Sequence, residues 1–272
     1  RKKNHNSQYS LLTMIETWKK KFDQNNTIGA IFMDLSKAFD TINHSLLLAK
    51  LEAYGFSKNA TKLLQSYVCN RHQKLCINRS FSEDKEIIAG VPQGSILGPL
   101  LFNIFLNDMF LFISKCEISN YADDNTLYSI GNDLPSIKEN LQVDFSKIAK
   151  WFSENHMVIN SGKCHYMIFG PHNEGEKINL NGVEVVNTNE QQILGITLDN
   201  QLSFKTHIQL LCKKSGQKLS ALSRIAPILP PEKKTNYNEL NHQVSIYILP
   251  FNMDVLFSLS KQIYKSYTRK ST

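Results

Sequence analysis

Several features that would place a protein in a special class are missing from this sequence. Its five cysteines are an odd number without a C-x-x-C spacing, which argues against a zinc site or a disulfide framework and favours a reducing compartment. No signal peptide is visible at the N-terminus. The most apolar stretch, residues 100–113, is interrupted by Asn103, Asn107 and Asp108 and is too short to span a bilayer. We therefore expect no membrane partner.

What is present is typical of a globular protein. The 272 residues are 42% hydrophobic and 20% charged, so the chain can bury a core as one large domain or as a domain with an appendage. A net charge of +7 weakly favours an anionic partner such as nucleic acid, although many other enzymes are equally basic. The chain opens on Arg1 without a methionine and stops at Thr272 soon after a partly apolar segment, so we expect a fragment of a larger protein.

The hydrophobic spacing predicts helices and strands in mixed order. Helical spacing occurs over residues 8–23, 44–54, 59–68, 99–112, 135–155 and 207–224. Strands are predicted at 28–33, at 73–79 paired with 85–91 across a polar turn at 80–84, on both sides of 121–124, at 156–160 and 163–169, and within 177–198 with turns at 181–182 and 187–190. Because most of these strands are joined by hairpins, the pattern indicates an α+β fold.

Three aspartates stand at the ends of predicted strands. Asp34 follows the continuous apolar run 28–33, which is typical of a strand buried on both faces. Asp123 and Asp124 occupy the tight turn of a hairpin. Two adjacent acids at the tip of a buried hairpin are costly unless a cation or a water-filled cleft receives them. Taken alone, however, such a pair is usually a solvated turn.

Other segments accompany these aspartates in a fixed order. Residues 32–40 read FMDLSKAFD, 90–99 read GVPQGSILGP, 121–124 read YADD, 160–163 read NSGK and 193–199 read ILGITLD. This ordered set resembles the reverse-transcriptase domain of non-long-terminal-repeat (LINE-type) retrotransposons, in which polymerase motifs A to E follow one another in the same way. The resemblance covers roughly residues 1–250 and is most specific over 30–40, 90–108 and 120–128.

The resemblance implies a polymerase palm, which is a ferredoxin-like antiparallel sheet with packed helices. The implied limits are a fingers remnant at residues 1–27, a palm at 28–226 with a fingers-like segment at about 44–90, and a linker with the divergent start of a thumb at 227–272. Arg1, Lys2 and Lys3 resemble the end of a fingers motif, and residues 236–258 lack the usual aromatic-cysteine-proline pattern of the thumb. We therefore expect partial fingers and a truncated thumb.

The activity that the resemblance implies is RNA-directed DNA polymerisation, in which a primer 3′-oxygen attacks the α-phosphorus of a deoxynucleoside triphosphate. Its implied partners are an RNA template, a DNA primer and deoxynucleoside triphosphates, in the nucleus or the cytoplasm. Two Mg²⁺ ions about 3.5–4 Å apart can stabilise the attacking and leaving oxygens of such a displacement. The resemblance assigns Asp34 and Asp123 as bridging ligands of the two ions, with Mn²⁺ as a possible substitute, and Asp124 as an auxiliary ligand or nearby charge.

Further roles follow from the resemblance position by position. Nucleotide binding is assigned to Leu35, Phe39, Gln93 and Gly94. Phe39 stands where the family places an aromatic ring under the sugar, so it is either a steric gate against a 2′-hydroxyl or an ordinary core phenylalanine. Gln93 and Gly94 belong either to a loop that contacts nucleotide and template or to a plain strand-to-helix turn.

Lys163 and the primer-binding residues carry weaker assignments. Lys163 matches the lysine that protonates or neutralises the leaving pyrophosphate, and its alternative is a solvated turn lysine. The floor below the primer terminus is assigned to Tyr121 and Ala122. Leu194 and Gly195 match the primer-grip hairpin, or else belong to one more palm strand. For Trp18, Trp151 and Cys164 we expect a packing role.

Two other functions stay open. The chain can be an inactive or co-opted fragment that keeps the palm fold and binds nucleic acid, or nothing, without turnover. A two-metal nuclease also needs clustered acids, but it does not explain the Pro-Gln-Gly loop at residues 92–94 or Phe39.

Overall fold

The computed structural model describes residues 7–121, 123–170 and 177–225 and divides the chain into two compact units. The first unit is Lys20–Thr188, and the second joins Arg1–Lys19 to Asn189–Thr272. Ala122, the basic residues Arg1 to Lys3 and the expected thumb segment at 227–272 lie outside the described residues.

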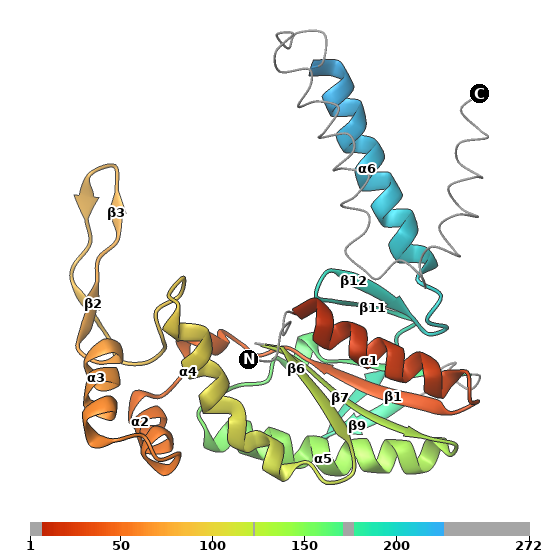
Figure 1. The fold of residues 1–272 in the computed structure, drawn as a ribbon, viewed down its shortest axis with the longest axis horizontal. Coiled ribbons are helices and arrows are strands. Elements are labelled where there is room, and N and C mark those ends of the chain that lie inside the picture. The colour runs from red at the N-terminus through yellow and green to blue at the C-terminus, as the bar shows by residue number, and fades with distance from the viewer. Residues whose placement is uncertain (1–6, 122, 171–176, 226–272) are drawn as a thin grey trace. The chain divides into compact units, whose positions relative to one another are not determined.

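A four-stranded antiparallel sheet forms the centre of the first unit (Figure 1). Its strand order is β6-β7-β1-β8, with β6 at Glu117–Tyr121, β7 at Asp124–Gly131, β1 at Thr27–Met33 and β8 at His165–Phe169. Every residue of the central strand β1 is buried, as the continuous apolar run predicts. The antiparallel pairing and the packed helices confirm the predicted α+β class.

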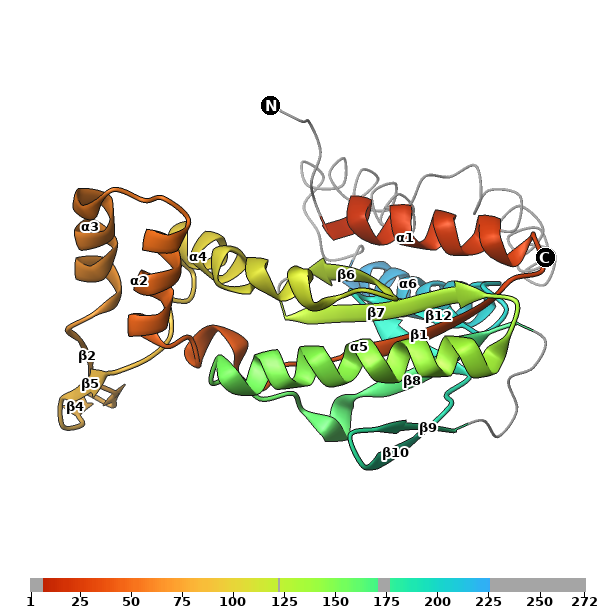
Figure 2. The same cartoon turned by 90° about the horizontal axis from the view of Figure 1, so that it is seen from below.

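Helix α5 (Leu134–Glu154) packs along β1 and β7 (Figure 2). Asp133 caps its N-terminus by accepting a hydrogen bond from the Ser136 N–H, and Pro135 occupies the first turn. The helix approaches β1 closely at Gly29, where a Cβ atom would lie 2.6 Å from Ile137 Cγ2. A larger residue at this position would therefore push α5 away from the sheet.

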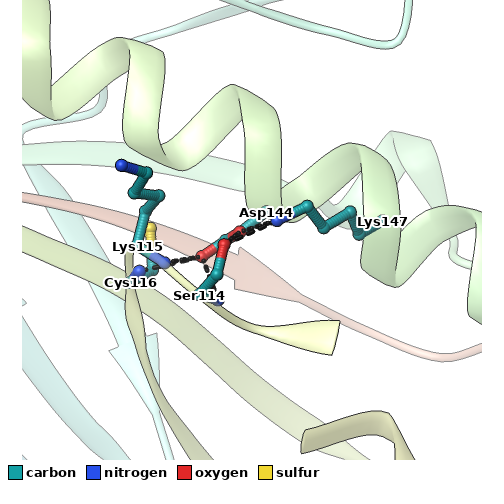
Figure 3. Close-up of polar contacts among 5 residues, drawn as sticks. All are labelled: Ser114, Lys115, Cys116, Asp144 and Lys147. Atoms are coloured by element: carbon teal, nitrogen blue, oxygen red, sulfur yellow. Dashed lines mark hydrogen bonds and ion pairs between the residues drawn. The ribbon is translucent and has the colours of Figure 1, made fainter. Parts of the chain in front are cut away.

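One carboxylate on α5 is fully buried (Figure 3). Asp144 Oδ2 accepts hydrogen bonds from the backbone N–H groups of Ser114, Lys115 and Cys116 at 3.0, 2.6 and 2.8 Å. Its Oδ1 accepts from Ser114 Oγ and from Lys147 Nζ, both at 3.0 Å. Burial by itself raises the pKa of Asp144, but the hydrogen bonds from the backbone and from Lys147 outweigh it and bring the pKa to about 2. The segment that leads into β6 is thereby fastened to α5.

The expected fingers-like segment consists of two helices and a hairpin. Its elements are α2 (His44–Ala53), α3 (Lys58–Val68), β2 (Arg71–Gln73), β3 (Cys76–Ile77), β4 (Ser80–Phe81) and β5 (Lys85–Ile87). Asn43 and Ser57 cap the two helices as hydrogen-bond acceptors. The predicted polar turn at 80–84 is wrong, because residues 80–81 form a strand and the turn lies at Asn78-Arg79, with φ of 49° and 66°. Asn tolerates this left-handed conformation better than most residues.

The loop of residues 90–96 leads into α4 (Leu97–Leu106), which continues as the 3₁₀ helix η2 (Asn107–Phe112). The helix predicted over 99–112 is thus confirmed in place, although its second half is wound more tightly. Pro99 lies in the first turn, where its missing N–H costs no hydrogen bond. A second 3₁₀ turn, η1 (Ala38–Asp40), follows the end of β1.

The strand predicted at 156–160 is wrong. Within this stretch Ile159 forms a single bridge with Leu35, and the next residues form the 3₁₀ turn η3 (Ser161–Lys163) before β8 begins at His165. By contrast, the predicted turn at Asn181-Gly182 joins β9 (Lys177–Leu180) to β10 (Val183–Val186).

Most of the second unit consists of helices and one hairpin. Its described elements are most of α1 (Ser7–Phe22), the strands β11 (Glu190–Ile193) and β12 (Ile196–Asp199), and α6 (Lys205–Ile225). The hairpin turns at Leu194 and Gly195, which both have positive φ, 47° and 83°. No helix within the described ranges is long and apolar enough to cross a bilayer.

Candidate active site

Asp34 is held at the end of β1 by the backbone. Its carbonyl accepts a hydrogen bond from the Asn160 N–H at 2.9 Å, and the Ser36 N–H donates to the Val158 carbonyl at 3.0 Å. Residues 158–160, although they form no strand, therefore bind the backbone on both sides of Leu35. The Asp34 carboxylate lies 3.1 Å from the Lys163 ammonium, so these two predicted residues are in contact.

Asp123 and Asp124 lie at the tip of the β6–β7 hairpin. Tyr121 pairs with Asp124, and Met33 on β1 pairs with Asn125, so Asp124 and Asp34 lie at the same edge of the sheet. Asn125 is buried, with its Nδ2 donating to the Asp123 carbonyl at 3.1 Å and its Oδ1 accepting from Asn120 Nδ2 at 2.7 Å. This amide pair stabilises the turn, and the predicted hairpin is confirmed.

The three aspartates are close enough to influence one another. Burial raises the pKa of Asp124, and the negative charges of Asp123 and Asp34 raise it further. Such mutual repulsion is what a bound cation would relieve, and carboxylate oxygens are the hard ligands that Mg²⁺ prefers. In the part of the chain that the structure describes, no three His, Cys, Asp or Glu side chains form a group that could hold a metal ion. Mg²⁺ usually takes only one or two protein carboxylates and completes its shell with water and phosphate oxygens, so the donor type of these aspartates is the observation that bears on a metal.

A cleft of about 410 Å³ opens beside Asp123, and we call it the first cleft. It is lined by Leu35, Lys37, Ala38, Phe39, Pro92, Gln93, Gly94, Pro99 and Asp123. All four residues predicted to bind the nucleotide are therefore brought together with one of the predicted metal ligands.

Phe39 is both a cleft residue and a packed aromatic. Its ring stacks on Phe102 of α4 with 4.5 Å between the ring centroids and 23° between the ring planes. The side chain is half-buried and lines the first cleft. The two interpretations that the sequence leaves open are therefore compatible, because core packing on one side can fix the ring against a ligand on the other.

Gly90 holds the two cleft-forming loops together. Its N–H donates to the Ile42 carbonyl at 2.8 Å, and its carbonyl is 2.7 Å from His44 Nε2 and accepts from Arg71 Nη2 at 2.8 Å. A Cβ atom at this position would lie 2.8 Å from Asp40 Cα, and φ is +86°, so only glycine fits without strain.

A second cleft of about 660 Å³ is also lined by residues of this loop. Lys37, Pro92 and Gln93 line both clefts, whereas Asp40 and Arg71 line only the second. Gln93 Nε2 donates to Asp40 Oδ1 at 2.8 Å.

Lys37 is a charged residue of the first cleft that is not predicted from the sequence. It is exposed, lines both clefts and has a left-handed φ of 49°. The signal available in the sequence was a cation three residues after Asp34. Its left-handed backbone, a feature concentrated at functional sites, is seen only in the structure.

The described residues that are predicted to bind the primer come from both units. Tyr121 ends β6 with 41% of its surface exposed, and Ala122 lies outside the described residues. Leu194 and Gly195 belong to the other unit. Trp18, Trp151 and Cys164 are buried, as a packing role requires.

Known proteins resemble this chain in sequence. Residues 2–198 match the family described as reverse transcriptase (RNA-dependent DNA polymerase). The chain is 31% identical to the RNA-directed DNA polymerase from mobile element jockey of Drosophila funebris. This match covers 67% of the present chain and 21% of the Drosophila protein. The chain is 29% identical to the probable RNA-directed DNA polymerase from transposon BS of Drosophila melanogaster. This match covers 74% of the present chain and 23% of the transposon protein. The chain therefore spans less than a quarter of each relative.

Solved structures support the same fold. A telomerase from Candida tropicalis, in complex with a fragment of telomeric RNA, aligns with 96% of this chain and 45% of its own, with a TM-score of 0.53 and 14% identity. The apo telomerase of the same organism aligns with 72% of this chain and 36% of its own, with a TM-score of 0.52 and 13% identity. These likenesses confirm the predicted palm-like antiparallel fold.

Proposed function

Because this chain belongs to the reverse transcriptase family, we propose that Asp34, Asp123, Asp124 and the first cleft form a site for RNA-directed DNA polymerisation. The proposed substrates are a DNA primer paired to an RNA template and the deoxynucleoside triphosphates added to its 3′-hydroxyl. The observation that carries the proposal is the first cleft itself, which joins the residues after Asp34, the Pro92–Gly94 loop and Asp123.

The aspartates supply the ligands that this chemistry needs. Asp34 and Asp123 would hold two Mg²⁺ ions, or Mn²⁺ as a substitute, with Asp124 as an auxiliary group. When bound, such ions stabilise the attacking and leaving oxygens of an in-line displacement. Burial, followed by the charges of Asp123 and Asp34, raises the pKa of Asp124, and this supports the assignment because a counter-cation would offset both effects.

The cleft walls supply binding and selection. Phe39, held against Phe102, is proposed to exclude a nucleotide with a 2′-hydroxyl. Gln93 and Gly94 are proposed to contact the nucleotide, together with Leu35. The exposed Lys37 is proposed to attract the triphosphate, because an ammonium group is a strong phosphate ligand as a point charge.

Lys163 is proposed to neutralise or protonate the leaving pyrophosphate. Its contact with Asp34 at 3.1 Å supports this role by showing that its ammonium reaches the aspartate site. We keep Tyr121, Ala122, Leu194 and Gly195 as proposed primer contacts, and residues 44–90 as the proposed fingers-like part of a palm at 28–226.

Primer extension tests the proposal. We expect Mg²⁺-dependent addition of deoxynucleotides to a DNA primer on an RNA template, and loss of this activity in Asp123→Ala. Asp84→Ala is the matched control, because Asp84 is an exposed acid that lines neither cleft. Equal extension by Asp123→Ala and the wild type would overturn the site.

The alternative function is nucleic-acid binding without turnover. Its signature would be a wild-type protein that binds primer–template in a fluorescence anisotropy assay but extends no primer. The same two measurements therefore separate a polymerase from a co-opted fragment.

A further inference from the structure

One side-chain contact joins the two loops that form the first cleft. Gln93 Nε2 donates to Asp40 Oδ1 at 2.8 Å. Gln93 lines both clefts, whereas Asp40 lines only the second. Asp40 thus contacts Gln93 from a position that lines the second cleft and not the first.

Backbone contacts fix the positions of both partners. The Asp40 N–H donates to the Lys37 carbonyl at 2.8 Å, and the Val91 N–H donates to the Phe39 carbonyl at 2.9 Å. Gly90 packs against the Asp40 backbone, where no Cβ atom would fit. The carboxylate and the amide are therefore carried by loops that are already locked together.

The chemistry of this pair decides which end of the amide faces away. An ionised carboxylate only accepts hydrogen bonds, so the NH₂ group of Gln93 must be the end that turns toward Asp40. The second Nε2–H and the Oε1 carbonyl then remain for a ligand, and Oε1 is the acceptor that this side chain offers.

We infer that Asp40 is a positioning residue that fixes the Gln93 amide so that the first cleft offers a hydrogen-bond acceptor to the incoming nucleotide. The complementary ligand group is a donor, such as a sugar hydroxyl or a base amino group. This inference rests on the proposed polymerase function and adds to it the orientation of one nucleotide-contacting side chain.

Single-nucleotide primer extension tests the inference through the separation of KM from kcat. In Asp40→Leu the acceptor is lost, and we expect the KM for the nucleotide to rise about three- to tenfold, as for one hydrogen bond, with a smaller change in kcat. Asp40→Asn, whose Oδ1 can still accept from Gln93, should recover most of this loss. Both side chains are exposed, so the melting temperature should change little, and Asp84→Leu serves as the control.

A reciprocal exchange sharpens the test. Gln93→Glu places a second carboxylate against Asp40, and repulsion should raise KM. Adding Asp40→Asn restores a donor–acceptor pair with the roles exchanged, so the double variant should be less impaired than Gln93→Glu alone. Additive effects of the two substitutions would overturn the inference.

A measurement without turnover separates this inference from the proposed function. The side-chain amide signals of Gln93 in a ¹⁵N–¹H NMR spectrum of the free protein, assigned by their loss in Gln93→Glu, should shift in Asp40→Leu and not in Asp84→Leu. Unchanged Gln93 signals in Asp40→Leu would overturn the inference even in an active enzyme. Shifted signals in a protein that extends no primer would support the amide orientation and refute the polymerase.

Discussion

Phe39 packs against Phe102 and lines the first cleft, where we propose that it also selects the sugar of the nucleotide. The stack on Phe102 restricts the movement of the ring beside this cleft. A fixed ring discriminates better than a mobile one, because a mobile ring can move aside for a bulkier sugar. The aromatic pair itself contributes about 0.5–1.5 kcal/mol beyond simple burial.

Shortening this side chain should relax the choice of sugar. In Phe39→Val we expect incorporation of ribonucleotides relative to deoxynucleotides to rise about tenfold or more, the range that small steric differences in a pocket provide. The ratio of kcat/KM for the two nucleotides is the measurement, since it cancels any general loss of activity.

Phe81→Val provides the control, because Phe81 is 72% exposed and lies on the β3–β4 hairpin outside both clefts. An unchanged ratio in Phe39→Val would show that Phe39 is a packing residue only.

The loop before α4 contains two glycines that make different demands. Gly90 and Gly94 both have positive φ, +86° and +76°, but only Gly90 is crowded by neighbouring backbone. Any alanine in this region of φ/ψ space costs about 1–2 kcal/mol. At position 90 the clash with Asp40 adds to this cost.

We therefore expect Gly94→Ala to lower the free energy of unfolding by about 1 kcal/mol and Gly90→Ala to lower it by clearly more. Urea denaturation of the two variants under identical conditions measures the difference. Equal losses would mean that the loops are not locked together at Gly90.

Asp144 connects α5 to the turn before β6, and its effect on stability should depend on pH. Its pKa is about 2 in the folded protein and about 3.9 in an unfolded chain. A lowered pKa stabilises the fold above the unfolded value, and the benefit is lost as pH falls from about 4 to about 2.

At neutral pH, Asp144→Asn should cost about 2–3 kcal/mol, because the amide cannot match three backbone donors and a lysine. We expect the difference from the wild type to shrink as the pH falls toward about 2. Urea denaturation over a series of pH values measures it, with the exposed Asp84→Asn as control. A difference that does not vary with pH would contradict the role of the charge.

These elements also show what sequence reasoning can reach. The buried strand β1 follows from its unbroken apolar run, and the β9–β10 turn follows from Asn181-Gly182, because both signals are local. The turn at Asn78-Arg79 was missed because a more polar stretch beside it looked more turn-like. The stretch around Ile159 has the composition of a strand, yet it forms only a single bridge, with Leu35. Pairing depends on the segment that lies beside it in the fold, which the local sequence does not show.

In the site, some residues could be predicted from the sequence, whereas the contacts between them could not. Asp34, Phe39, Gln93 and Asp123 could be placed in one site because of the family resemblance, and the cleft brings most of them together. The contact of Gln93 with Asp40 joins positions 53 residues apart, and that of Asp144 with Ser114 joins positions 30 apart. Such contacts depend on tertiary packing, so no local pattern reveals them.

For the molecule as a whole, the net charge of +7 bears on binding to nucleic acid. Cationic side chains that contact phosphates release counterions, so affinity falls as salt rises. With about four phosphate contacts, we expect the affinity for an RNA–DNA primer–template to fall by about two orders of magnitude between about 50 and 200 mM salt. Fluorescence anisotropy titrations measure the slope. A salt-independent affinity would contradict a phosphate-based interface.

The buried Asp144 has a consequence for how this protein can vary. Three of its five hydrogen bonds come from main-chain N–H groups of Ser114, Lys115 and Cys116, which any residue except proline supplies. The exposed side chain of Lys115 is therefore free to diverge among descendants of this chain, provided that the carboxylate across from it persists, whereas the side chain of Cys116 also packs against the core. We expect the constraint to be stronger at Asp144 on α5 than at Lys115 in the turn that it secures.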